Sequence, residues 1–448
     1  MAEETTSFPA DKKPELIDKV EVFETETPSL KLPSGTVGAP TLSEGVFPMR
    51  TGVALVFSGA RKDGTLIFHG MTNRGPTLPA PRVRGEDGSL SQARYFLSPM
   101  FQPRIMRIEV GAGRARVLGP VALTNSEGKA YSGLPPRDRK FGKVLSLANK
   151  EISGSNRSVD PEGLAISADG GFWVTDAYGP AIRLFSAQGV ERDALTPGDG
   201  LPAGLAGFPD ALCGLSVLPD GRLITIDMDS LGIDRFARLI VIDPVARTSR
   251  SYLWALERQT WKRTARPVIG DLAAAGPEQF LVLESGIAKG GARRAQLVLA
   301  DFSEAEEITG IPSDKIARWK RNRPGIVART TLMNLADLGQ NAASIKGIAL
   351  LPDGQTVAAV SDSNFGAELR VEDPVIEVPT VTDYVLEADG TLTFAGEKSG
   401  ARLTVVRKNP TDIRTQFFLI RLGRPVLGGD EEETEGAGEP AETPQPAD

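Results

Sequence analysis

The 448-residue chain contains one cysteine and one histidine, and this scarcity excludes several kinds of chemistry. Cys213 cannot form an internal disulfide bond, so no covalent cross-link of that kind stabilises the fold. His69 alone cannot supply a zinc site built from several histidines. A Ser-His-Asp mechanism would need His69 as its base, and no nucleophile elbow accompanies it. We therefore expect oxygen chemistry, from carboxylates, Asn and Arg, with a hard metal ion as the candidate cofactor.

Long apolar runs and positive charge are also lacking. No run approaches the roughly 18 apolar residues that a membrane-spanning helix needs. The net charge of −7 argues against a nucleic-acid or anionic-membrane surface. The first residues, MAEETTSFPADKKPE, lack the basic start and apolar core of a signal peptide. We expect a cytoplasmic protein if the sequence is complete, or an exported protein whose leader is not part of it.

Glycine and proline are abundant, with 48 and 33 residues, which is typical of many turns between short strands. Residues 160–180, DPEGLAISADGGFWVTDAYGP, show this pattern most clearly. Two apolar runs flank the turn at Asp169-Gly170-Gly171, which predicts a β-hairpin. Antiparallel pairing would bring Glu162, near the start of the first strand, and Asp176, at the end of the second, to one sheet edge.

Two strands around a glycine turn recur along the chain. Copies cover residues 51–73, 213–227, 270–284 and 346–362, and the third of these is the loosest. Repeated sheet-forming units predict an all-β fold, a β-propeller. The length favours six blades, with five or seven as the alternatives. A pair of β-sandwiches does not account for a polar residue that recurs at the end of the same strand.

Three parts are expected along the chain. Residues 1–28 are polar and have little to bury, which predicts a disordered arm. Residues 29–427 would form a single propeller. Residues 428–448, GGDEEETEGAGEPAETPQPAD, lack apolar periodicity and predict a disordered acidic tail.

An acid or amide ends the second strand of each repeat. These residues are Asn73, Asp176, Asp227, Glu284 and Asp362. Equivalent positions in a propeller form a ring about its axis, so the side chains would converge on a channel mouth. A cation would relieve the repulsion between them, and Ca²⁺, or another divalent cation, accepts oxygens from several blades. The alternative is that each residue caps a turn at its strand end.

Several motifs occur in an order that resembles the esterase-like phytase domain family, over roughly residues 35–366. They are Thr72–Pro76 (TNRGP), Ser132–Pro135 (SGLP), Asp160–Gly163 (DPEG), Asp176–Pro180 (DAYGP), Phe280–Glu284 and Ile345–Gly366. The resemblance implies a β-propeller with ester-hydrolysing activity that is periplasmic or secreted. Cys213 and Lys346 stand where that family has Glu.

The first functional hypothesis is a metal-dependent hydrolase of a small phosphorylated or ester substrate. The catalytic candidates are Glu162, Asp176 and Asp227. The metal-ligand candidates are Glu162, Asp176, Asp227, Glu284 and Asp362. The substrate-binding candidates are Arg74, Asn73 and Lys346. Arg183 is a further candidate to hold a phosphate, and its alternative is an outward-facing strand residue.

Two other functions remain open. A degenerate, non-catalytic propeller would bind a ligand, or a protein partner through surface loops such as residues 289–329. The replacement of Glu by Cys213 and Lys346 favours this function. A calcium-dependent lactonase of the six-bladed type is the third, although several such enzymes use a histidine base.

Overall fold

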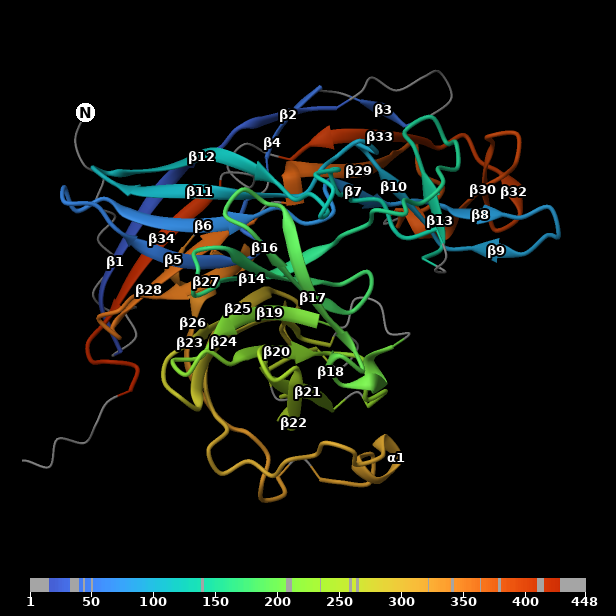
Figure 1. Ribbon diagram of the computed structural model, residues 1–448. Helices are drawn as coiled ribbons and strands as arrows, with labels where there is room; N and C mark the ends of the chain where they lie inside the picture. Colours follow the sequence, from blue (N-terminus) through green and yellow to red (C-terminus); the bar gives the residue numbers. More distant parts are fainter. Residues whose placement is uncertain are drawn as a thin grey trace, which may run out of the picture.

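The computed structural model describes residues 16–32, 40–42, 45–49, 51–137, 141–206, 212–233, 235–257, 260–262, 266–320, 322–339, 342–362, 364–377, 380–408 and 415–427. These residues are mainly β-strands, with one four-residue helix, α1 (Ser313–Ile316), and short 3-10 turns (Figure 1). No helix in this part of the chain is long and apolar enough to cross a membrane. The acidic segment 428–448 lies outside the described residues.

Antiparallel units of four strands make up most of the fold. The first contains β5 (Leu55–Ala60), β6 (Leu66–Met71), β11 (Arg104–Gly111) and β12 (Arg114–Ala122). The second contains β14 (Pro161–Ile166), β15 (Phe172–Asp176), β16 (Ala181–Phe185) and β17 (Glu191–Pro197), with β18 (Gly200–Leu201) at its edge. The third contains β19 (Leu212–Val217), β20 (Leu223–Asp227), β21 (Phe236–Asp243) and β22 (Thr248–Ala255). The fourth contains β23 (Val268–Ala274), β24 (Gln279–Ile287), β25 (Arg293–Asp301) and β26 (Ala328–Asn334).

The fifth unit joins the two ends of the fold. It contains β27 (Ile345–Leu350), β28 (Thr356–Ser361), β34 (Gln416–Leu422) and, as its outer strand, β1 (Ile17–Glu26). β1 pairs antiparallel with β34 and, through Thr25 and Glu26, parallel with β12 of the first unit. Residues 17–26 are therefore a strand, and the prediction of a disordered arm over 1–28 is wrong for them. The long-range pairing with β34 orders them.

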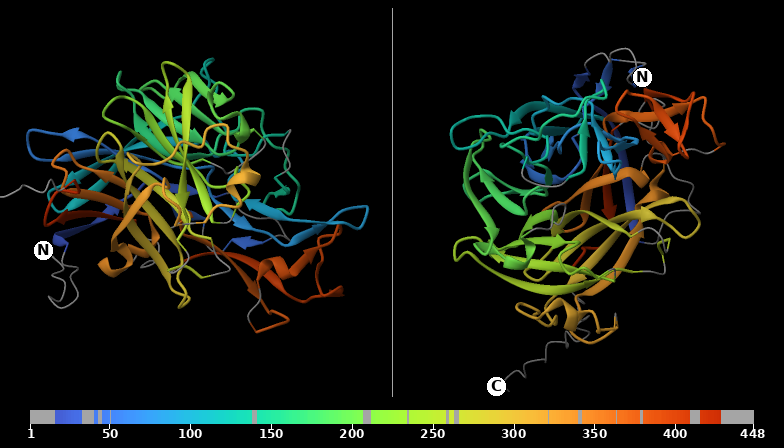
Figure 2. Two further views of the ribbon diagram at one scale, coloured as in Figure 1. Left: turned by 90° about the horizontal axis from the view of Figure 1, so that it is seen from below. Right: turned by 90° about the vertical axis from the view of Figure 1, so that its right-hand side faces the viewer.

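The first strands of the units lie side by side in a closed order, β5, β14, β19, β23, β27 and back to β5. The right-hand view of Figure 2 shows the units following one another in chain order around this ring. Four-stranded antiparallel sheets arranged about a common axis are the architecture of a β-propeller. The described residues form five such units. The count of six stays a prediction that they do not support, and five was one of its alternatives.

An apolar cluster lies between each two neighbouring units. Between the second and third units, for example, Trp173 and Ile182 pack with Leu223 and Ile240. Strands covered on both faces in this way are buried along their whole length, as in β20, where all five residues are buried.

A separate lobe of small sheets lies beside the ring (Figure 1, upper right). Its strands are β2 (Ser29–Lys31), β3 (Thr41–Leu42), β4 (Val46–Pro48), β7 (Thr77–Pro79), β8 (Arg82–Arg84), β9 (Leu90–Ser91), β10 (Ala93–Phe96), β13 (Lys143–Leu145), β29 (Ala367–Glu372), β30 (Tyr384–Leu386), β31 (Leu392–Phe394), β32 (Glu397–Lys398) and β33 (Arg402–Arg407). They come mainly from insertions between β6 and β11 and between β28 and β34, and they share an apolar core around Tyr95 and Val405. The range 29–427 thus holds this lobe as well as the ring.

Candidate functional site

Three of the five strand-end residues share one register. Asp176 pairs with Pro161, Asp227 with Leu212 and Glu284 with Ile269, each at the start of the inner strand. In the fifth unit, Ser361 holds the equivalent place, opposite Ile345. In the first unit, β6 ends at Met71. Asn73 and Asp362 therefore lie beyond the shared position, and the prediction that all five are equivalent is wrong for these two.

Each of the predicted strand-end side chains has hydrogen-bond partners in the protein. Asp227 accepts hydrogen bonds from the N–H groups of Asp229 and Ser230, both at 3.0 Å, and from the Ser230 hydroxyl. Burial raises the pKa of Asp227, and these hydrogen bonds oppose the rise. Asn73 accepts from the N–H of Gly75 (3.3 Å) and Asp362 from that of Asn364 (2.7 Å). These contacts are the turn caps of the alternative hypothesis.

Glu284 is fully buried and satisfied by three side chains. Trp254 Nε1 donates to Oε1 (3.1 Å), and Gln296 Nε2 and Arg329 Nη2 donate to Oε2 (both 2.8 Å). The Arg329 guanidinium also lies over the Trp254 ring. A carboxylate with these partners joins the third unit, through Trp254 on β22, to the fourth unit, and it has little capacity left for a metal ion.

Glu162, Cys213 and Lys346 occupy one position in three units, immediately before the glycine of each inner strand. Glu162 and Lys346 lie where the strand register shifts, so Pro161 rather than Glu162 faces Asp176, and in the third unit the shift follows Cys213. Lys346 donates to the Ser285 hydroxyl at 3.4 Å. Burial and the nearby carboxylates of Glu162 and Asp227 raise the pKa of the Cys213 thiol.

The structure does not bring the predicted calcium ligands together. All five are among the described residues, and in that part of the chain no three His, Cys, Asp or Glu side chains are placed to hold a metal. Ca²⁺ needs six to eight oxygens at short range. The strand-end carboxylates instead hold hydrogen bonds within their own surroundings.

Backbone fills the axis where the inner strands approach one another. A Cβ atom at Gly163 would lie 2.5 Å from the backbone carbon of Gly214, and one at Gly347 would lie 2.9 Å from that of Ala54. In the fourth unit this position is Asp271, which is fully buried. The N–H groups of Leu55 and Ile348, from two other units, donate to its Oδ2 at 2.9 and 3.0 Å.

Asp271 was not among the predicted site residues. Burial raises its pKa well above the usual value, and the backbone hydrogen bonds only partly oppose this. The signal in the sequence was an acid inside an otherwise apolar run, VIGDLAA. Because its unit was the loosest copy, the position could not be aligned with the glycines.

Four motifs of the family resemblance meet near the end of β15. The Arg74 guanidinium pairs with Asp160 (2.6 Å), and the Arg74 N–H donates to the same carboxylate (3.0 Å). Arg74 also lies over the Tyr178 ring, and the Tyr178 hydroxyl donates to Gly133 O (2.7 Å). A Cβ atom at Gly133 would lie 1.8 Å from Arg74 O, so only glycine fits there. TNRGP, SGLP, DPEG and DAYGP thus form one structural unit.

Asp176 continues this unit. Its Oδ1 accepts from the N–H groups of Asp160 and Tyr178, both at 3.1 Å, and its Oδ2 accepts from Arg183 Nε (3.0 Å). Burial raises the pKa of Asp176, and Arg183 opposes the rise. Arg183 is therefore not an outward-facing strand residue, because it bonds to the strand-end carboxylate of its own sheet.

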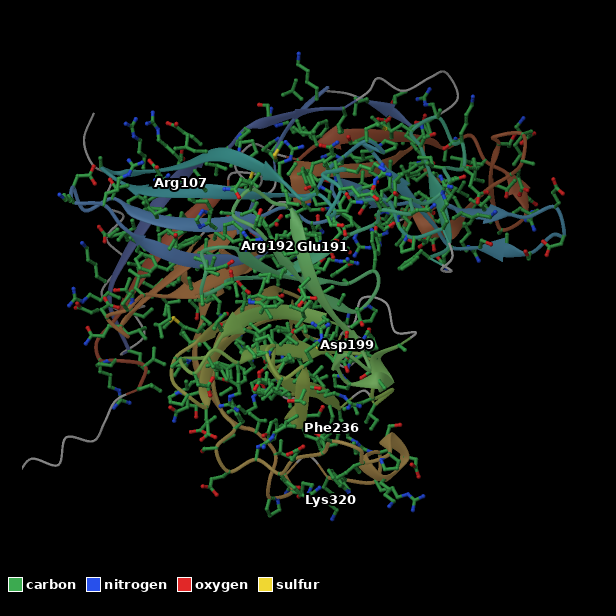
Figure 3. The ribbon with its side chains drawn as sticks, viewed as in Figure 1. Arg107, Glu191, Arg192, Asp199, Phe236 and Lys320 are labelled. Atoms are coloured by element: carbon green, nitrogen blue, oxygen red, sulfur yellow. The ribbon has the colours of Figure 1, made fainter. Side chains whose placement is uncertain are left out.

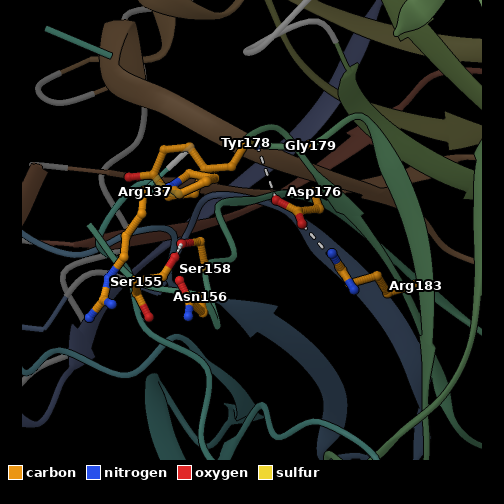
Figure 4. A pocket seen from close by; sticks show the side chains of 9 residues that line it. Arg137, Ser155, Asn156, Ser158, Asp176, Tyr178, Gly179 and Arg183 are labelled. Atoms are coloured by element: carbon orange, nitrogen blue, oxygen red, sulfur yellow. Dashed lines mark hydrogen bonds and ion pairs between the residues drawn. The ribbon is translucent and has the colours of Figure 1, made fainter. Parts of the chain in front are cut away.

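A cavity of about 440 Å³ lies against this side of the second unit. Its lining residues are Pro136, Arg137, Ser155, Asn156, Ser158, Asp176, Tyr178, Gly179 and Arg183. Figure 4 shows Asp176 and Arg183 on one side and the Ser155–Ser158 segment with Arg137 on the other. We call it the β15 pocket. Of the predicted catalytic residues, only Asp176 lines it.

His69 takes no part in the pocket lining. Its imidazole lies on β6, edge-on to Phe172 at 5.0 Å between ring centres. Burial and the positive charge of Arg107 lower its pKa to about 4. The ring is therefore neutral at physiological pH and packs against Phe172.

The fold and the pocket together define a β-propeller-type protein with a polar cavity at the side of one unit. A family model described as phytase-like, with esterase-like activity of phytase, matches residues 94–365. The match covers more than half of the chain, and the chain belongs to this phytase-like family. The matched residues include the whole β15 pocket.

An uncharacterized secreted protein of Arthroderma benhamiae is 46% identical over 100 residues. The match covers 19% of this chain and 19% of that protein, so the chain spans about a fifth of that relative's length.

Two solved structures show weak similarity. A virginiamycin B lyase from Staphylococcus aureus has 13% identity and a TM-score of 0.29, and the match covers 77% of this chain and 97% of that one. A PQQ-bound aldose sugar dehydrogenase from Streptomyces coelicolor has 12% identity and a TM-score of 0.29, with 78% and 94% covered. At these TM-scores the similarities carry no argument, and the fold rests on the strand topology.

Proposed function

We propose that the protein hydrolyses a small ester, phosphoric or carboxylic, in the β15 pocket. One observation carries the proposal: Asp176, Tyr178 and Gly179 of the DAYGP segment, which contacts the other three motif segments, line a polar cavity. Membership of a family with esterase-like activity supports the reaction class.

Asp176 is the candidate general base. Asp176 lines the pocket, and burial raises its pKa. A carboxylate with a raised pKa is a stronger base and accepts a proton from water more readily. Arg183 keeps the carboxylate oriented through Nε. Both groups sit on the rigid strands of the second unit, which holds them in a fixed geometry.

Hydrolysis of an aryl phosphate and an aryl acetate, with and without chelator, tests the proposal. We expect release of the phenol from at least one ester, and Asp176→Asn should lower kcat/KM by roughly 10²-fold or more, the range of general-base catalysis. Activity that survives this substitution in folded protein would place the chemistry elsewhere.

Calcium dependence remains a prediction. Titration calorimetry with calcium and manganese tests it, repeated with Glu162→Gln and Asp176→Asn. Binding that disappears in both variants would support a shared ion. No detectable binding by the wild type would remove the metal-dependent form of the hypothesis.

A second candidate function is a non-catalytic module that binds a ligand or protein. The observation that favours it is the saturation of the strand-end carboxylates by internal partners, together with Cys213 and Lys346 at the inner-strand position. Ligand binding without turnover of either ester would establish this alternative.

We also propose that the protein works outside the cytoplasm, periplasmic or secreted. Support comes from the partial relative named as a secreted protein. Fractionation of the native producing cells, followed by immunodetection, tests this, and a signal confined to the cytoplasm would contradict it.

A further inference from the structure

Two of the three nitrogen atoms of the Arg183 guanidinium, Nε and Nη1, have protein partners. Its Nε donates to Asp176, and its Nη1 donates to Glu191 Oε1 (2.8 Å) and to the Tyr131 hydroxyl oxygen (3.3 Å). Its Nη2 makes no hydrogen bond to any residue that the structure describes. The side chain is 21% exposed and lines the β15 pocket. One pair of guanidinium N–H donors is therefore available to a ligand.

The residues that hold the Arg183 guanidinium also contact one another. The Tyr131 hydroxyl donates to Glu191 Oε2, and the Tyr131 ring lies 5.4 Å from the guanidinium carbon of Arg183. Burial raises the pKa of Tyr131, so the phenol stays a neutral donor. Burial disfavours charge on Arg183, but Asp176, Tyr131 and Glu191 outweigh this and raise its pKa. The cation is permanent and oriented.

Donors face Arg183 across the cavity. Ser155 and Asn156 contribute a hydroxyl and an amide group, and the exposed Arg137 adds a second guanidinium. The Ser158 hydroxyl already donates to Ser155 O (2.7 Å). Planar guanidinium donors opposite hydroxyl groups suit a phosphate or a carboxylate. Asp176 and Glu191 offset the charge of Arg183, so orientation of its N–H groups matters more here than net charge.

This inference rests on the proposed function and names its substrate class. We propose that Arg183 binds the oxyanion group of the substrate through Nη2, and that Glu191 and Tyr131 are positioning residues that orient the guanidinium. The preferred esters are those that carry a phosphate or carboxylate group, and neutral esters bind less well.

Binding is measured first, independently of catalysis, by titration calorimetry of the full chain with inorganic phosphate and, separately, acetate. We expect phosphate binding by the wild type and a loss of roughly 10-fold or more in affinity for Arg183→Gln, as for a charged hydrogen bond. Acetate binding identifies a carboxylate ligand in the same way. No binding of either anion by the wild type would overturn the inference.

Arg192→Gln is the matched control. Arg192 follows Glu191 on β17, is exposed and pairs with Asp169 outside the pocket (both Glu191 and Arg192 are labelled in Figure 3). We expect its anion affinity to equal that of the wild type. An equal loss in Arg192→Gln and Arg183→Gln would show a general charge effect and overturn the assignment to Arg183.

The positioning role is tested by comparing Glu191→Ala with Glu191→Gln. Alanine removes the acceptor of Nη1, and phosphate affinity should fall by roughly 3- to 10-fold, the effect of one hydrogen bond. Glutamine keeps an acceptor oxygen without the charge and should restore most of the affinity. Tyr131→Phe should give an intermediate loss. If Glu191→Gln bound phosphate as weakly as Glu191→Ala, or if neither variant lost affinity, the positioning role would be overturned.

Hydrolysis assays separate the inference from the function on which it rests. If the wild type cleaves the neutral aryl acetate, binds neither anion and is unaffected by Arg183→Gln, the inference fails and the hydrolase remains. If phosphate binds through Arg183 and neither ester is cleaved, the hydrolase fails and the anion site remains.

Discussion

Asp271, near the axis, and Asp176, beside the β15 pocket, are both buried aspartates, but their surroundings give them different roles. Asp271 has no exposed surface and accepts N–H groups from two other units. Asp176 accepts N–H groups from nearby loop residues and a guanidinium, and it lines a cavity. The first ties inner strands together, whereas the second is placed to meet a ligand. A polar residue near a propeller axis is therefore not by itself a site.

The largest effect is expected at the axis. Asp271→Ala leaves the buried N–H groups of Leu55 and Ile348 without an acceptor, at about 1–3 kcal/mol each. We expect the free energy of unfolding in urea to fall by about 2–6 kcal/mol. Asp271→Asn keeps an acceptor oxygen and should lose much less. Equal stability of the alanine variant and the wild type would remove Asp271 from the structural role.

Close approach of the inner strands gives the next effect. Gly163→Ala would place a Cβ atom 2.5 Å from the Gly214 backbone, and the strands would have to separate, at about 1–3 kcal/mol. Gly204→Ala is the control, since no atom lies within 4 Å of its Cβ position. Thermal unfolding should show a clear drop only for Gly163→Ala. An unchanged melting temperature for Gly163→Ala would mean that the inner strands leave room for a methyl group.

The smallest of the stability effects is a pH dependence. Because the pKa of Asp271 is raised in the folded protein, its contribution to stability is complete below the unfolded pKa of about 3.9 and is lost as pH rises toward the folded pKa. The wild type should therefore lose stability relative to Asp271→Asn as pH rises above about 4. Asp176 and Asp227 titrate in both proteins, so their effects cancel in the stability difference between the wild type and Asp271→Asn. Parallel stability curves would contradict a raised pKa for Asp271.

Much of the ring could be predicted because the hairpins are local. The turn at Asp169–Gly171 and its two strands were visible as short-range patterns, and β14 and β15 confirm them. The pairing of β1 with β34 joins segments from opposite ends of the chain, and no local sequence pattern predicts it. The hairpin of β30 and β31 is also local, but its place in the side lobe depends on a parallel contact with β8.

The candidate site was predicted in part. Asp176 and the motif segments were identified, and the structure brings them together near the end of β15, where the DAYGP segment lines the β15 pocket. Glu191 and Tyr131 were missed because their role depends on a contact with Arg183 that only the folded sheet creates. The predicted equivalence of the five strand-end residues was wrong for Asn73 and Asp362, which lie beyond the shared position. A register shift also places Pro161 rather than Glu162 opposite Asp176.

The central claim is that chemistry resides at the β15 pocket and not around the axis. Asp176 and Asp227 test it directly, because they hold the same register, end equivalent strands and cap equivalent turns, yet only Asp176 lines the pocket. The measurement is kcat/KM for aryl ester hydrolysis by Asp176→Asn and Asp227→Asn, each per folded protein. The account predicts a loss of roughly 10²-fold or more for Asp176→Asn and no loss for Asp227→Asn. Equal losses in both variants would contradict it and restore a shared axial site.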